Sequence, residues 1–340
     1  MISRRIAGVE RTGRIVGAIA AVCGPVAGVA ASQGGVMDSA RTAVRGGAVD
    51  AWSAIRDDPW TWVHVVAAIV VLAVLGAVGV LRPGTLKGGR DVSPHPWGIW
   101  LACGLIVLGT SWVGGGIVAT LLGLAEVART GEDESSIMAS LTLREQGMVS
   151  VCGYAMAVTA ALVMRRILAM SAPRAGLEWR GDAWVRGGVA AVLVWPVVQA
   201  AAIAATWVVL RAGGEAPPRV AHTTLQTILD SRDDPWAWAL AATAIVGAPI
   251  VEEFVFRVGL QSAALRLFGK PWVAIVLSAA AFAAIHMGDP RTAQWPAMAA
   301  LATLGLCLGF AYEKTRSFLV PIIIHAVFNA ANVGLALASN

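Results

Sequence analysis

The sequence predicts an all-α fold, a polytopic transmembrane helical bundle of eight to nine helices. Hydrophobic residues make up 57% of the 340 positions and charged residues only 14%. Apolar runs of about 20 residues recur between short charged loops, and that length is what a helix needs to cross a hydrocarbon core of about 30 Å. We therefore expect an integral, multi-pass protein of the lipid bilayer, in the cell (plasma) membrane.

Three regions follow from the hydropathy pattern. Residues 1–60 are predicted to hold a basic segment, a weak first membrane helix at 15–31 and a loop. A signal sequence cleaved near Ala31 is the alternative for that first helix, and we favour its retention. Residues 61–219 are expected to form the N-terminal transmembrane helices, and residues 220–340 a C-terminal transmembrane core.

Eight strong helices are expected after the first segment. The pentapeptide Arg-Asp-Asp-Pro-Trp precedes two of them, at 56–60 and 232–236. Asp at the N-cap and Pro at the first helical position are typical helix starts, and Trp is typical of the membrane interface. The predicted ranges are 61–81, 97–125, 147–170, 184–210, 237–268, 271–287, 296–312 and 318–338.

The distribution of basic residues predicts the orientation. Lys and Arg are concentrated in alternate connections, which begin with residues 1–14. The positive-inside rule therefore places the N-terminus inside and the C-terminus outside. The acidic loop at 131–134 then lies outside, as solvated surface.

The net charge does not indicate a nucleic-acid partner, and the cysteines do not indicate disulfides or a metal site. The net charge is +5, but its basic residues lie where the membrane orientation requires them, so we expect no nucleic-acid binding. The four cysteines have no CxxC spacing and are interpreted as free thiols in apolar helices. They are Cys23, Cys103, Cys152 and Cys307.

Two adjacent carboxylates interrupt the apolar helix at 237–268. Charged side chains inside a membrane are costly, so such residues indicate a functional site. Glu253 and Arg257 have the i,i+4 spacing of an ion pair, whereas Glu252 points about 100° away. One carboxylate is then neutralised and the other is available for chemistry. Pro249 removes a backbone hydrogen bond just before Glu252 and is expected to bend the helix or to open room for water.

Polar residues in two later helices fall at a similar depth. Glu252 lies 17 residues before Gly269 and His286 lies 17 residues after it, so a hairpin turning at Gly269 places both about 25 Å from the turn. His325 and Asn329 share one face of the last helix at i,i+4 spacing. Gly305 and Gly309 form a small-xxx-small pair that would let the last two helices approach closely.

The ordered motifs resemble a known peptidase family. They are Glu-Glu-x-x-x-Arg at 252–257, Phe-x-x-x-His at 282–286 and His-x-x-x-Asn at 325–329. This triplet is similar to the CAAX protease and bacteriocin-processing (CPBP) family of intramembrane peptidases, which includes the type II CAAX prenyl endopeptidases. The resemblance covers about residues 220–335, and one departure is Val258, where the family more often has Gly.

The resemblance implies hydrolysis of peptide bonds in membrane-associated proteins or peptides. In that reading Glu252 is the general base on a water positioned with His286, and His325 with Asn329 stabilises the oxyanion. Glu253 and Arg257 would support the helix and its charge balance. Phe282 and Phe328 would pack at the site or line the substrate channel.

Metal use and three other interpretations stay open at this point. No cofactor is favoured; a zinc ion, if present, would use Glu252, His286 and His325, although the His-Glu-x-x-His pattern of a metalloprotease is absent. The site residues could instead be polar partners in a bundle core, with Asn329 making an interhelical hydrogen bond. The alternative functions are a non-proteolytic scaffold or immunity factor and a proton-coupled transporter. His64, His95 and His222 have no motif and receive no role, and the substrate and oligomeric state are not predicted.

Overall fold

The computed structural model describes residues 56–82, 84–86, 89–121, 142–212, 223–287 and 295–338. Within these ranges all regular structure is helical, which confirms the predicted all-α fold. Seven of the described helices are long and apolar enough to cross a membrane, and Pro271–Ile285 is a shorter apolar helix. The predicted first helix at 15–31, the acidic loop at 131–134, Cys23 and His222 lie outside the described residues.

The eight predicted helices are present, with ends that differ from the predicted ones by four residues or fewer. The longest, Pro235–Phe268, is one continuous helix with two π-helical segments, Thr243–Gly247 and Phe254–Gln261. The helices are α5 (Pro59–Ala77), α6 (Trp97–Leu121), α8 (Leu143–Ser171), α9 (Ala183–Arg211), α10 (Thr223–Asp230), α11 (Pro235–Ala242), α12 (Ala248–Glu253), α13 (Ser262–Phe268), α14 (Pro271–Ile285), α15 (Trp295–Thr315) and α16 (Leu319–Ala338).

The repeated pentapeptide begins two helices in the same way. Asp58 Oδ1 accepts from Trp60 N at 3.3 Å at the start of α5, and Asp234 Oδ1 accepts from Trp236 N at 2.8 Å at the start of α11. Each aspartate is therefore the N-cap that the sequence predicts, with Pro at the first helical position. The shared chemistry fixes where both helices begin.

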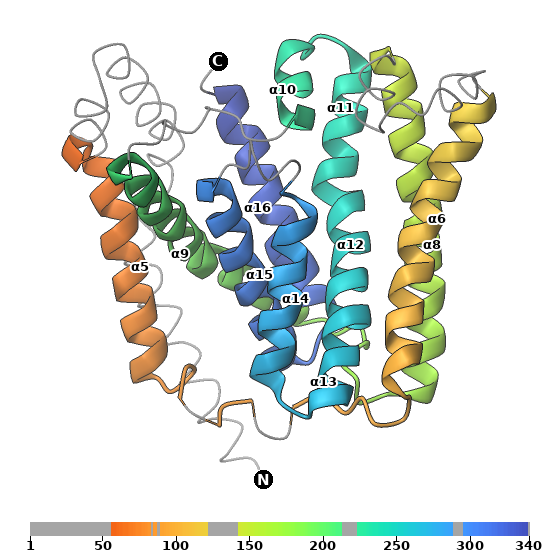
Figure 1. Cartoon of the computed structure of the whole chain (residues 1–340), viewed down its shortest axis with the longest axis horizontal. Helices are drawn as coiled ribbons and strands as arrows, with labels where there is room; N and C mark the ends of the chain where they lie inside the picture. The colour runs from red at the N-terminus through yellow and green to blue at the C-terminus, as the bar shows by residue number, and fades with distance from the viewer. Residues whose placement is uncertain are drawn as a thin grey trace.

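The long helices alternate in direction through the bundle (Figure 1). Three of the connections at the lower end of that view contact one another through the backbone. Asp91 N donates to Arg174 O at 3.0 Å, and Phe318 N donates to Gly176 O at 2.8 Å. This common end is the one for which the basic residues predict the inner membrane face.

Glycines mark the closest helix contacts. A Cβ on Gly259 would lie 3.0 Å from Gly104 Cα, so α6 and the π-helical segment Phe254–Gln261 touch through their backbones. The sequence predicts that Gly305 and Gly309 let the last two helices approach closely. That prediction is wrong about the neighbouring helix, because the two glycines do not face α16. A Cβ on Gly305 would lie 3.1 Å from Ala279 Cα on α14, and one on Gly309 would lie 2.7 Å from Gln261 Oε1.

At Pro249 the structure shows a π-helical segment, Thr243–Gly247, that ends just before the proline. Immediately before Pro249, Ala248 N donates to Thr243 O, five residues back instead of four. In this register the N–H of residue 249 would bond to Ala244 O, and proline has no N–H. The helix therefore widens before the two glutamates of α12. Ala244 O has no backbone donor at residue 249 and is available to a donor from another helix.

Candidate active site

The structure brings Glu252, His286 and His325 together from three helices. Glu252 Oε2 lies 4.0 Å from His286 Nε2 and 3.8 Å from His325 Nε2. The side chains of Glu252 and His286 keep 19% and 21% of their surface exposed, whereas that of His325 keeps 5%. The carboxylate thus faces two imidazole nitrogens across a gap of water size, and the predicted equal depth of Glu252 and His286 is confirmed.

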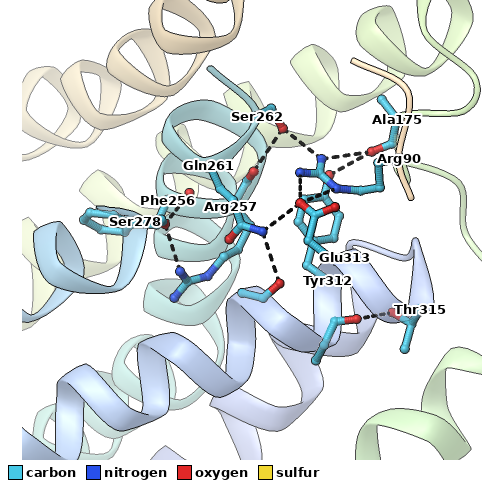
Figure 2. Close-up of polar contacts among 12 residues, drawn as sticks. Arg90, Ala175, Phe256, Arg257, Gln261, Ser262, Ser278, Tyr312, Glu313 and Thr315 are labelled. Carbon is cyan, nitrogen blue, oxygen red and sulfur yellow. Dashed lines mark hydrogen bonds and ion pairs between the residues drawn. The ribbon is translucent and has the colours of Figure 1, made fainter. Parts of the chain in front are cut away.

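Beside this group, Glu253 and Arg257 form the ion pair that their spacing predicts. Arg257 Nε donates to Glu253 Oε2 at 2.9 Å, and both side chains are fully buried. Arg257 Nη1 also donates to Ser278 Oγ at 2.9 Å, and Ser278 in turn donates to Phe256 O (Figure 2). Sequence reasoning missed Ser278, although it is the one hydroxyl-bearing residue in α14.

The second nitrogen of each histidine is fixed by the protein. His286 Nδ1 lies 2.7 Å from Phe282 O, and because a carbonyl oxygen only accepts, Nδ1 carries a hydrogen. His325 Nδ1 lies 3.1 Å from Glu253 Oε1, and the carboxylate paired with Arg257 is likewise an acceptor. Both rings are therefore held so that Nε2 faces Glu252.

Charge balance limits the protonation of this group. Arg257 neutralises Glu253, so the group carries one net negative charge if Glu252 is ionised and both imidazoles are neutral. An uncompensated charge is costly in an apolar bundle. One further proton, on Glu252 or on either imidazole, makes the group neutral.

The two predicted phenylalanines differ in position. Phe282 is fully buried, and its ring centre lies 4.9 Å from that of His286 and 5.6 Å from that of His325. It therefore packs against both imidazoles. Phe328 is partly buried and contacts Trp195 on α9, with ring centres 5.4 Å apart.

Asn329 makes the interhelical hydrogen bond that was one interpretation of its position. Its Nδ2 donates to Ala244 O at 2.8 Å. Ala244 O is the acceptor that Pro249 cannot serve, so Asn329 fastens α16 to the widened part of the helix before Glu252. The amide group is held beside the widened segment by this bond, and Nδ2 has a second hydrogen.

Glu252, His286 and His325 have side chains of the kinds that bind zinc, but the separations between their oxygen and nitrogen atoms are large for ligands of one ion. Two imidazoles and one carboxylate are a donor set found in catalytic zinc sites. In a tetrahedral site with bonds of about 2.0–2.1 Å, neighbouring ligand atoms lie about 3.3 Å apart, whereas here the separations from the carboxylate oxygen are 3.8 and 4.0 Å. Over the described ranges of the chain, no group of three His, Cys, Asp or Glu residues has the arrangement of a metal site.

Comparison with known proteins supports the motif reading for one part of the chain. Neither the curated proteins nor the solved structures compared with it gave a match. A family model matches residues 234–331, which span all three motifs. Over that segment the chain is similar to the family of Type II CAAX prenyl endopeptidases, Rce1-like, which confirms the resemblance that the motifs indicate.

Proposed function

We propose that the chain is an intramembrane endopeptidase that cleaves membrane-associated proteins or peptides. The observation that carries this proposal is Glu252 facing two imidazole Nε2 atoms at 3.8 and 4.0 Å, inside a helical membrane protein. The name of the matched family, an endopeptidase, supports the same reaction class.

A water in the gap would have two acceptors. Glu252 removes one proton from the water as the general base. His286 Nε2 accepts a hydrogen bond from the other O–H and so orients the water. The water oxygen then attacks the carbonyl carbon of the scissile peptide bond. Because His286 Nδ1 is bonded to Phe282 O, its Nε2 lone pair stays directed at the water.

The tetrahedral intermediate needs donors for its oxyanion. In this proposal the reacting enzyme carries a second proton on His325, whose Nδ1 is held by Glu253, so that Nε2–H is one donor. The second Nδ2 hydrogen of Asn329 is proposed as the other donor. When the C–N bond breaks, the proton on Glu252 passes to the leaving nitrogen. The products are a carboxylic acid and an amine, and Glu252 is again a carboxylate.

We further propose that this chemistry uses no metal. The spacing around Glu252 accommodates a water held by two acceptors, and it is wider than the spacing of ligands around one zinc ion. A zinc ion, if bound, would be held by Glu252, His286 and His325 and would supply Lewis-acid polarisation of the water.

The test uses purified protein in detergent with a library of quenched fluorescent peptides. We compare the wild type with Glu252→Gln and with Glu178→Gln, which removes an exposed carboxylate far along the chain from the motifs. Loss of the base is expected to lower kcat about 10²- to 10⁴-fold in Glu252→Gln alone. Cleavage that persists in Glu252→Gln would overturn the assignment, and binding of a partner without cleavage would favour a scaffold.

The metal question needs its own arm. Each protein is assayed with and without a strong chelator, and its metal content is measured by mass spectrometry. Activity that survives chelation in protein without stoichiometric metal is the expected result. Activity lost with the chelator and regained with zinc would refute the metal-free mechanism but leave the peptidase assignment in place.

A further inference from the structure

Arg90 lies outside the matched segment, yet its side chain is completely buried within the helices of that segment. It enters from the connection between α5 and α6, at the lower end of the bundle in Figure 1. Figure 2 shows its guanidinium group between Glu313, Ser262 and Ala175. Its Nε and Nη2 donate to Glu313 Oε1 at 3.1 and 2.5 Å, and its carbon Cζ lies 3.8 Å from the ring centre of Tyr312.

Glu313 requires this cation. It is 2% exposed and lies in the last turn of α15, where the helix dipole disfavours a negative charge. Glu313 Oε1 accepts from Arg90 and also from Gln261 Nε2 at 2.9 Å. Burial is the largest influence on the pKa of the Arg90 guanidinium and acts to lower it. The charge and hydrogen bonds of Glu313, together with Tyr312, outweigh burial, so that pKa is raised.

A chain of contacts joins Arg90 to the candidate active site. Arg90 Nη1 donates to Ser262 Oγ at 2.8 Å, and Ser262 Oγ donates to Arg257 O at 3.1 Å. Arg257 holds Glu253 Oε2, and Glu253 Oε1 accepts from His325 Nδ1. Each step is a buried polar contact, so a displacement at one step changes the geometry of the next.

We propose that Arg90 is a positioning residue for the peptidase reaction, acting through Ser262 and Arg257 on the orientation of His325. The inference rests on the proposed function and adds to it a residue from the N-terminal half of the chain. Arg90 sets the rotamer of Ser262, and Ser262 fixes the backbone of the π-helical segment that carries Arg257. Arg90 touches neither Glu252 nor the histidines, so it is not itself catalytic.

The first test separates turnover from substrate binding. Arg90→Ala is compared with Arg90→Lys and with Arg174→Ala. Arg174 is exposed, and it lines a pocket at this end of the bundle that Arg90 and Glu313 also line. Because a small displacement of a catalytic group can cost about 100-fold, we expect kcat to fall about 10- to 100-fold in Arg90→Ala with KM little changed. Arg174→Ala is expected to keep the wild-type kcat, and Arg90→Lys to recover part of it.

Chemical rescue distinguishes positioning from a requirement for folding. Arg90 and Glu313 line a pocket of about 1000 Å³, through which a small cation can reach the space that Arg90→Ala vacates. Methylguanidinium at millimolar concentration is therefore expected to restore kcat to the folded Arg90→Ala protein severalfold. Methylammonium, which cannot form the paired bonds to Glu313, is expected to restore less.

A second readout needs no substrate. With ¹⁵N-labelled histidine, the Nδ1 and Nε2 resonances of His325 are assigned by their loss in His325→Gln, and those of His64 by its own substitution. Arg90→Ala and Ser262→Ala are both expected to shift the His325 resonances while those of His64, on α5, stay in place. Ser262→Ala is the milder change and serves if Arg90→Ala fails to fold.

The outcomes separate this inference from the proposed function. An unshifted His325 spectrum in both variants, or a wild-type kcat in folded Arg90→Ala, overturns the positioning role even if Glu252→Gln is inactive. A kcat loss that neither lysine nor methylguanidinium recovers, without a His325 shift, reduces Arg90 to a structural residue. Shifted His325 resonances in a protein that cleaves no peptide would keep the coupling and reject the peptidase.

Discussion

Replacing Arg257 by alanine should be among the most destabilising substitutions in this protein. The change leaves the fully buried carboxylate of Glu253 without its cation and removes two hydrogen bonds of 2.9 Å, to Glu253 and to Ser278. Breaking a buried pair from one side costs about 3–5 kcal/mol. His325 still donates to Glu253 and offsets part of this, so we expect about 3 kcal/mol, or roughly 6–12 °C in Tm.

A thermal melt with a thiol-reactive dye measures the loss, because the buried Cys103 becomes accessible on unfolding, and the signal of the exposed Cys152 is read as the baseline before the transition. The matched control is Arg186→Ala, because Arg186 and Asp182 form a pair with the same i,i+4 spacing but with side chains about half exposed. An exposed pair contributes less than about 1 kcal/mol. Equal Tm values for the two variants would refute the argument that burial makes the Arg257 pair important.

Two further substitutions test the backbone of the site helix. Pro249→Ala supplies an N–H that competes with Asn329 for Ala244 O, so we expect unchanged or higher Tm with slower peptide hydrolysis; full activity would contradict that role for Asn329. Gly259→Ala places a Cβ 3.0 Å from the α6 backbone and should cost about 1–3 kcal/mol in the same melt. Gly188→Ala, with nothing within 4 Å of the added Cβ, is its control and should not lower Tm.

Much of the fold is predictable because membrane helices depend on local sequence. Apolar length and the two Asp-Pro caps are read directly along the chain, and eight helices follow from them. The partner of a helix face is not local information. The small residues Gly305 and Gly309 predict a close contact, but nothing in their spacing selects α14 and Gln261 over α16 as the neighbour.

The candidate site divides in the same way. Equal distances from the turn at Gly269 predict that Glu252 and His286 lie at one depth, and i,i+4 spacing predicts the Glu253 ion pair. The orientation of each imidazole depends instead on the acceptor that its Nδ1 meets after folding. For His325 that acceptor is 72 residues away in the sequence, at Glu253.

The π-helical segments explain why the polar residues around the glutamates are needed together. Each segment alters the backbone hydrogen bonding of the site helix, and in each a side chain donates to a carbonyl oxygen there: Asn329 to Ala244 O and Ser262 to Arg257 O. These two bonds lie on either side of α12, which carries both glutamates. In the first segment Ala244 O is left for Asn329 because Pro249 has no N–H to donate to it. The two side-chain bonds therefore connect α16 on one side, and Arg90 through Ser262 on the other, to the helix that carries the glutamates.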